Sequence, residues 1–323
     1  LGEDPIMLPA LLMSVSGYML PQGPAIFAAK HDRSPASAMM LQAPPPQGFV
    51  WAELSEDTST SEDMPAIIIG GGRIGSLLAS LGAGGTVMKR DDPFPATPAT
   101  GPIYVCTRND ALAGIVESTP EHRREDLVFL QNGMLGAFLE ERGLADATQV
   151  LLYLAVSKLG EEPIDGITNL NPEGLTTASG KWAGAFAARL RAGGLKCRQL
   201  DGDAYCAAML EKHVWICAFM MVGALNGGIT VGEVGEKHSD ELRVLIEELC
   251  SAGEAALGIS LPTGAYERLT AYGRSVAHFP TAVKEFEWRN GWFHQLTLAA
   301  EAVGKPDPAP RHTAGLQKLG VVQ

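Results

Sequence analysis

A lysine stands at the start of a very apolar stretch of the 323-residue chain. Residues 211–225 read EKHVWICAFMMVGAL, in which Glu211 and Lys212 precede a long run without formal charge. If this segment is helical, Ile216 and Met220 share the face of Lys212. Lys212 is then either a core-helix lysine that extends its alkyl stem to water or a catalytic lysine that protonates a developing oxyanion. The segment alone does not decide between the two.

A glycine-rich turn suggests the chemistry that such a lysine would serve. In IIIGGGRIG, which includes Arg73 and Ile74, the glycines at Gly70, Gly72 and Gly75 fit the pattern GxGxxG. The three glycines permit a tight turn, close approach of the backbone to a diphosphate and close packing of a helix on a strand. A helix that begins here would offer free N–H groups to the phosphates. The pattern predicts a dinucleotide-binding site.

The residues that follow the second expected strand indicate which nucleotide is bound. Lys89 and Arg90 stand there, where an acidic residue would favour NAD. Two cations suit a 2′-phosphate, which arginine can bind through two hydrogen bonds. The sequence therefore favours NADP (NADPH), although Asp91 and Asp92 follow directly and leave a solvated charged turn as the alternative.

The elements around these residues predict an α/β class with a Rossmann-type parallel sheet and then an all-α region. Short apolar runs that alternate with helix-compatible intervals indicate βαβ units. Beyond about residue 200 the patterns support helices, and the last residues, rich in Pro and Gly, are expected to form a tail. The expected strands are residues 66–69, 86–88, 103–106, 127–130 and 150–156, and the expected helices are residues 76–81, 110–117, 135–142, 204–225, 240–257, 263–272 and 281–303.

Composition narrows the class of protein. The formal net charge is −12 without a dense basic block, which disfavours nucleic acid as a partner. The five cysteines form no CxxC pair, which favours a reducing compartment, and no His/Cys spacing predicts a metal site. Residues 1–63 are predicted to be an extended N-terminal arm and linker that becomes ordered on the globular body or on a partner.

Several of these motifs together resemble ketopantoate reductase and its relatives. The resemblance covers residues 64 to about 306 and is carried by IIIGGGRIG, VCTRNDAL, FLQNGM, EKHVWICAF and residues 275–290. It implies a Rossmann domain at residues 64–200 and, at residues 201–323, a substrate and dimerisation domain like that of 6-phosphogluconate dehydrogenase. The runs PIYVCTRN and EFEWRNGWF also resemble a plant and algal plastid group, which implies a plastid location, with the cytoplasm as the alternative.

The resemblance also implies roles for single residues. Arg108 and Asn132 match cofactor-binding positions of the family. Lys212 matches its general acid, which protonates the carbonyl oxygen as hydride arrives at the adjacent carbon. Ser275 matches a serine that binds the substrate carboxylate, and Glu287 matches a glutamate near the reacting hydroxyl.

The chain departs from the family on the lysine helix. The family carries asparagines four and eight residues beyond the lysine, where this chain has Ile216 and Met220. Each lost pairing costs about 1 to 3 kcal/mol, so ketopantoate itself is not the expected substrate. Asn226 is the candidate for a partial substitute. The segment between the second and third strands is also short, so part of the usual wall near the adenosine end is expected to be missing or supplied by the arm.

Two hypotheses follow from the sequence. The first is an NADP-dependent reductase of a small 2-oxo acid or related carbonyl compound, with Lys212 as general acid. The alternative is a catalytically degenerate protein of the same fold that serves as a structural or nucleotide-sensing accessory subunit of a larger complex, for example at a plastid membrane, docked through residues 1–63. A homo-oligomer is compatible with either hypothesis.

Overall fold

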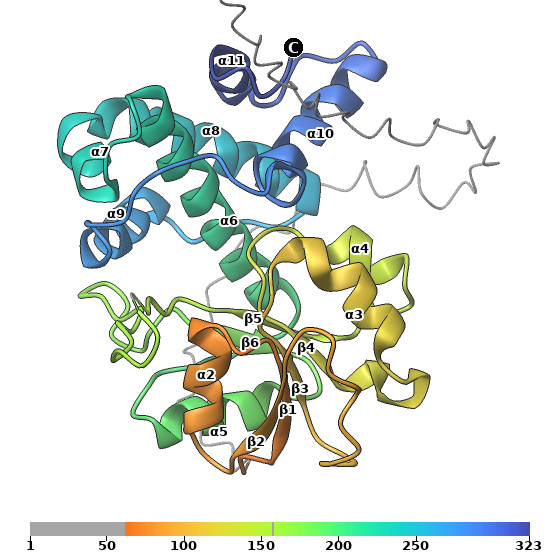
Figure 1. Ribbon diagram of the computed structural model, residues 1–323. Helices are drawn as coiled ribbons and strands as arrows, with labels where there is room; N and C mark the ends of the chain where they lie inside the picture. The colour runs from red at the N-terminus through yellow and green to blue at the C-terminus, as the bar shows by residue number, and fades with distance from the viewer. Residues whose placement is uncertain (1–61, 157) are drawn as a thin grey trace, which may run out of the picture. The chain divides into compact units, whose positions relative to one another are not determined.

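The computed structural model describes residues 62–156 and 158–323 (Figure 1). The predicted N-terminal arm lies outside the described residues except for Glu62 and Asp63, and so does the docking role assigned to it. The described residues belong to one compact unit of the chain.

In the part of the chain that the structure describes, seven strands form one sheet in the order β2-β1-β3-β4-β5-β6-β7. Neighbouring strands from β2 to β5 are parallel, and β6 runs antiparallel to β5 but parallel to β7. The predicted Rossmann-type parallel sheet is therefore confirmed, with β6 and β7 as additions that the apolar runs did not indicate. The strands are β1 (Ala66–Ile69), β2 (Gly85–Met88), β3 (Ile103–Val105), β4 (Leu127–Phe129), β5 (Thr148–Leu151), β6 (Thr177–Ser179) and β7 (Arg198–Gln199).

The central strands β1, β3 and β4 are buried on both faces of the sheet, which explains their unbroken apolar runs. Along β1, Ile67 and Ile69 belong to one core cluster and Ala66 and Ile68 to another. Helices α3 (Leu112–Ser118) and α4 (Gly136–Glu140) cover the first face, and α2 (Arg73–Ser80) and α5 (Ala183–Ala192) cover the second (Figure 1). Two 3-10 turns, η1 (Asn109–Ala111) and η2 (Glu121–Asp126), precede α3 and β4. The described segment between β2 and β3 contains no helix, while the expected contribution of the arm to the wall near the adenosine end lies outside the described residues.

Beyond β7 every regular element of the described chain is helical, as expected. Helix α6 (Gly202–Leu225) carries EKHVWICAF. It is long and apolar enough to span a membrane, yet 67% of its most apolar window is buried inside the protein. It is apolar on all sides because the other helices surround it. The elements are α6 (Gly202–Leu225), α7 (Val231–Lys237), α8 (Ser239–Leu257), α9 (Ala265–Ser275), η3 (Phe286–Trp288), α10 (Asn290–Ala302) and α11 (Pro310–Lys318).

Two expectations for the C-terminal part were wrong. The helix expected over residues 281–303 begins only with α10, and the short turn η3 is the only regular element of residues 281–289. Glu285, directly before η3, has a left-handed backbone (φ 47°), which an α-helix does not allow. The expected tail contains α11, which begins with Pro310 at a position where proline is compatible with a helix. His312 and Leu316 of α11 are fully buried, so this segment is part of the core.

Candidate active site

The three glycines of the turn each meet a different steric requirement. Gly70 has φ +102°, and a Cβ on it would lie 2.8 Å from the carbonyl oxygen of Cys106. A Cβ on Gly75 would collide with the carbonyl oxygen of Gly70, so this glycine lets α2 pack onto the turn. A Cβ on Gly72 would meet no atom within 4 Å. The backbone at Gly72 is thus open to an approaching ligand, whereas Gly70 and Gly75 allow the close backbone contacts within the turn.

The turn lies where the strand order reverses, between the carboxyl ends of β1 and β3. The N-cap of α2 is Gly72, no side chain caps this helix, and its first turn has no acidic residue. A helix end with these properties favours an anion. At the same end Arg73 donates from Nη1 to the carbonyl oxygen of Val156 at 2.9 Å, and Ile74 packs on the core. The residues present fit a dinucleotide diphosphate.

The two cations after β2 lie on a turn that the neighbouring acid shapes. The backbone N–H of Lys89 donates to Oδ2 of Asp92 at 2.8 Å, and the N–H of Asp92 donates to the carbonyl oxygen of Lys89 at 3.3 Å. Asp91 has φ 69°. The side chains of Lys89 and Arg90 are exposed. The Asp92 carboxylate is therefore engaged by the turn backbone, while both cations extend toward solvent.

The loops that follow β3 and β4 are tied together. Nε2 of Gln131 donates to the carbonyl oxygens of Val105 and Thr107, at 2.8 and 3.1 Å. The side chain of Asn109 donates to the carbonyl oxygen of Asn132 at 3.0 Å. These bonds keep Asn132 next to the loop that carries Arg108.

Arg108 points away from the protein body. Its side chain is 78% exposed and pairs with Asp110 at 2.9 Å, a contact that is easily exchanged for another anion. A cation in this position, at the same edge of the sheet as the glycine turn, can reach a phosphate.

The segment 285–289 of the helical part packs on these same loops. The backbone N–H of Met134 donates to the carbonyl oxygen of Trp288 at 2.9 Å, and that of Asn109 donates to Oε1 of Glu285 at 3.4 Å. Glu285 also forms an ion pair with Arg289. The carboxyl edge of the sheet is therefore in contact with residues that come from beyond α9.

Lys212 is held inside the protein rather than at its surface. Lys212 is 6% exposed, and its Nζ donates a hydrogen bond to the carbonyl oxygen of Leu152 at 2.8 Å. Nζ also lies 4.9 Å from the centre of the Tyr153 ring. Burial, together with the positive charge of Arg289, lowers the pKa of Lys212 to about 7. Lys212 therefore exchanges its proton near neutral pH, which a surface lysine does not.

The cation that acts on Lys212 and the acid that pairs with this cation were not predicted from the sequence. Glu287 is exposed in η3, whereas Glu285 holds Arg289, and the charge of Arg289 acts on Lys212. The spacing of Glu285 and Arg289, four residues apart in EFEWR, was the available signal for this pair. Glu287 as the acid near the reacting hydroxyl stays a prediction.

The two predicted substrate-binding residues both belong to the helical part, and the role of Ser275 stays a prediction. Asn226 is the C-cap of α6, where its side chain donates to Val222 and Glu241 at 2.9 and 3.1 Å. At about 1.5 Å of rise per residue it lies about 21 Å along the helix from Lys212, so the structure does not bring the two together. Ser275 ends α9, and its hydroxyl donates to the carbonyl oxygen of Tyr272 at 2.7 Å.

No protein-family model and no curated protein sequence matches the chain. Solved structures match its fold over 80% of its length. A 2-dehydropantoate 2-reductase from Geobacter metallireducens GS-15 is 17% identical and is covered completely, with a TM-score of 0.58. A ketopantoate reductase from Ralstonia eutropha JMP134 is 17% identical and 99% covered, with a TM-score of 0.55. A D-mandelate dehydrogenase in a ternary structure with NADH and anilino(oxo)acetate is 12% identical and 98% covered, with a TM-score of 0.56. The chain thus has the fold of the ketopantoate reductases, and the sequence resemblance to that family extends to its architecture.

Two glycine substitutions separate the structural role of the turn from its binding role. Gly75→Ala is expected to lower the free energy of unfolding by about 1 to 3 kcal/mol, because its Cβ collides with the Gly70 carbonyl. Gly72→Ala has free space for its Cβ, so its stability stays close to wild type, yet the methyl group occupies the open approach to the backbone. Urea unfolding and calorimetric titration with NADPH measure the two effects. Unchanged NADPH affinity in Gly72→Ala would contradict a diphosphate at this turn.

Proposed function

We propose that the protein is a nicotinamide-nucleotide-dependent reductase of a small 2-oxo acid, with Lys212 as its general acid. The observation that carries the proposal is the buried amine of Lys212, whose pKa is lowered to about 7 beside the cation Arg289. A proton donor works best when its pKa is close to the working pH. The D-mandelate dehydrogenase of the same fold, which binds NADH and anilino(oxo)acetate, supports this class of reaction.

The nucleotide is proposed to be NADPH, held by the turn at Gly70, Gly72 and Gly75. When bound, a reduced nicotinamide would supply the hydride. Gly72 leaves the backbone open to the diphosphate, and the N-terminus of α2 favours its charge. Lys89 and Arg90 are exposed beyond β2, where a 2′-phosphate would lie, and both attract it.

Lys212 delivers the proton in this scheme. Its ammonium group stabilises negative charge that develops on the substrate carbonyl oxygen, and then donates a proton to it. The neutral amine that remains still has two N–H groups. One of them can keep the 2.8 Å hydrogen bond to the Leu152 carbonyl, so the side chain does not have to leave its place during the transfer.

Arg289 is proposed to bind the carboxylate of the 2-oxo acid. It is the cation whose charge acts on Lys212, and its Nε is buried without a hydrogen-bond partner. A carboxylate satisfies such a donor and offsets the repulsion between the two cations. Glu285, which pairs with Arg289 and accepts from Asn109, positions the guanidinium against the loop after β3.

The lysine helix also limits the substrate side chain. Ile216 is buried on the face that Lys212 shares and cannot bind a hydroxyl group. We therefore propose a 2-oxo acid with an apolar side chain in preference to a hydroxylated one.

The test of the proposal is NADPH oxidation by the full chain with a panel of 2-oxo acids. Branched aliphatic and aromatic 2-oxo acids are expected to be reduced at a higher kcat/KM than ketopantoate, and NADPH is expected to be preferred to NADH. Nucleotide binding without oxidation by any 2-oxo acid would overturn the reductase while keeping the dinucleotide site. The accessory-subunit hypothesis stays a prediction, since its docking segment lies outside the described residues.

The pH dependence should follow the protonation of Lys212. With a pKa of about 7, the ammonium form is present below pH 7 and is lost above it, so the reductase kcat/KM falls as the pH rises through 7. Arg289→Leu removes a positive charge that lowers this pKa, so the midpoint should move to higher pH. Lysine-labelled NMR titration of the Lys212 Cε resonance measures the same pKa without substrate. A midpoint near that of an exposed lysine in the wild type would contradict the assigned role.

A further inference from the structure

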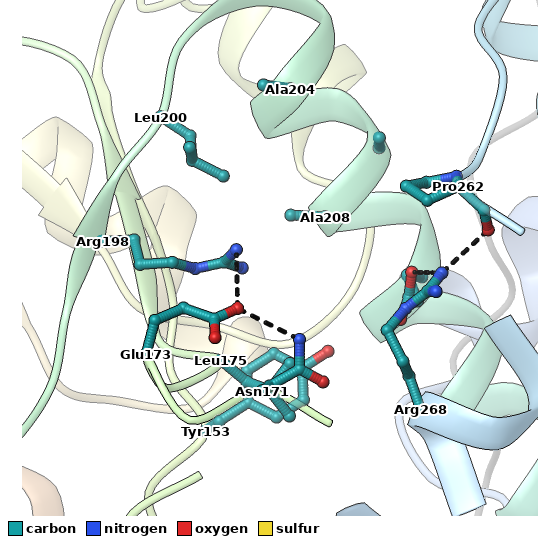
Figure 2. Close-up of a pocket in the computed structure, with 12 residues that line it drawn as sticks. Tyr153, Asn171, Glu173, Leu175, Arg198, Leu200, Ala204, Ala208, Pro262 and Arg268 are labelled. Carbon is teal, nitrogen blue, oxygen red and sulfur yellow. Dashed lines mark hydrogen bonds and ion pairs between the residues drawn. The ribbon is translucent and has the colours of Figure 1, made fainter. Parts of the chain in front are cut away.

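A separate cavity of about 210 Å³ lies between the sheet edge at β7, helix α6 and the segment that leads into α9 (Figure 2). One wall is formed by small residues of α6, Ala204 and Ala208, with Leu200 beside them. The rest of the apolar lining comes from Tyr153, Leu175, Ala207 and Pro262. These groups offer contact area but no charge, so the body of a ligand here would be apolar.

The charged residues of the cavity are already paired with one another. Arg268 binds Glu211 through two hydrogen bonds of 2.8 and 2.9 Å, and it also donates to two backbone carbonyl oxygens. Arg198 lies 3.7 Å from Glu173. The two pairs cancel in charge, and a carboxylate or an ammonium group placed between them would meet repulsion from one member of each pair. The cavity therefore favours a neutral molecule.

Two buried polar atoms of the cavity residues have no hydrogen-bond partner among the described residues. Asn171 is 8% exposed, and its amide nitrogen donates to Glu173 at 3.2 Å, but its Oδ1 accepts no hydrogen bond. Nε of Arg198 is also buried and donates none. Figure 2 shows Arg198, Glu173 and Asn171 on one side, across the cavity from Ala204 and Ala208. A buried acceptor and a buried donor without partners cost stability unless a ligand or water satisfies them.

The volume sets the size of the ligand. An engineered apolar cavity of about 150 Å³ holds one benzene molecule, so the present volume suits one ring with a small polar substituent. We propose that this cavity is a binding site for a neutral, ring-sized molecule that donates one hydrogen bond to Asn171 Oδ1 and accepts one from Arg198 Nε. An aromatic primary carboxamide has this combination of groups.

The cavity borders the surroundings of Lys212 but does not include that residue. Ala208 and Ala204 precede Lys212 by four and eight residues and lie on its side of α6, whereas Glu211 lies about 100° from it round the helix. Tyr153 contacts both, since it lines the cavity and its ring lies 4.9 Å from Lys212 Nζ. The proposal does not depend on the reductase function, and its test uses neither nucleotide nor 2-oxo acid.

The test is titration of the full chain with benzamide, followed by calorimetry and by NMR of labelled tyrosine. We expect saturable binding with a shift of the Tyr153 resonance. Benzoate and benzylamine, which have nearly the same shape but carry a charge, should each bind at least about tenfold more weakly. Absence of saturable benzamide binding, or equal affinity for all three compounds, would overturn the proposal.

Three variants locate the binding. Ala208→Phe places a ring in the cavity and should abolish benzamide binding, whereas Ala299→Phe, which adds the same ring at an exposed position of α10, should not change it. Asn171→Leu removes the acceptor at nearly constant volume and should weaken binding about tenfold. Thermal unfolding shows whether each variant is folded. Benzamide binding that survives in a folded Ala208→Phe protein would place the ligand elsewhere and overturn the assignment.

Discussion

Lys212→Met should lower kcat/KM for reduction of the best 2-oxo acid by about 10²- to 10⁴-fold, the range expected for loss of a general acid. This corresponds to about 2.7 to 5.5 kcal/mol of transition-state stabilisation. Methionine has a similar length and no proton to donate. NADPH affinity should remain near wild type, because the glycine turn lies on another part of the chain. Steady-state kinetics and calorimetric titration of NADPH measure the two quantities.

The folded state should tolerate this substitution. Lys212 is buried, and burial of an amine opposes its charging, so an apolar side chain of similar volume removes that cost while leaving the Leu152 carbonyl without one donor. Lys237→Met is the matched control, since Lys237 is an exposed lysine of α7 that pairs only locally with Glu233. If Lys212→Met kept kcat/KM within about threefold of the Lys237→Met protein, the lysine would be structural.

Arg189→Met should lower the free energy of unfolding by about 3 to 5 kcal/mol, the loss typical of a broken buried charge pair. Arg189 is fully buried in α5 and pairs with Asp63 at 3.0 Å. It also donates to the carbonyl oxygens of Met64, Leu78 and Gly84, at 2.6, 2.8 and 2.8 Å. The substitution removes one donor from Asp63 and one from each of these carbonyls. The guanidinium thus joins the segments that begin β1 and β2 to the end of α2.

Arg191→Met is the control for this prediction. Arg191 belongs to the same helix and is exposed, so its loss should change stability by less than about 0.5 kcal/mol. Urea unfolding followed by circular dichroism gives both values. Equal midpoints for the two variants would show that the buried network contributes nothing to the stability of the sheet.

Much of the Rossmann part could be predicted from short sequence patterns. The expected strand at residues 66–69 matches β1, because four apolar residues between turn formers are typical of a central parallel strand with both faces covered. The strands β6 and β7 could not be predicted in this way. Their residues, among them Thr177 and Arg198, form no apolar pattern. The two strands pair because β5 and α5 place them next to one another.

The helical part could likewise be predicted only in part. The apolar run of α6 predicted a core helix, and 281–303 predicted more helix than is present. The interruption at Glu285 depends on its ion pair with Arg289 and its hydrogen bond from Asn109, which lies more than 170 residues earlier in the chain. A local pattern does not contain such a contact.

The sequence by itself determined the class of the fold, the glycine turn and the position of Lys212 at the start of an apolar run within a helix, because each depends on neighbouring residues and on the periodicity of helix and strand. Only the tertiary structure decided what surrounds Lys212. Burial beside Tyr153 and the charge of Arg289 lower its pKa to about 7, while Asn226 is kept at the far end of α6. A pKa depends on desolvation and on charges that approach through space, and these come from segments distant in the chain.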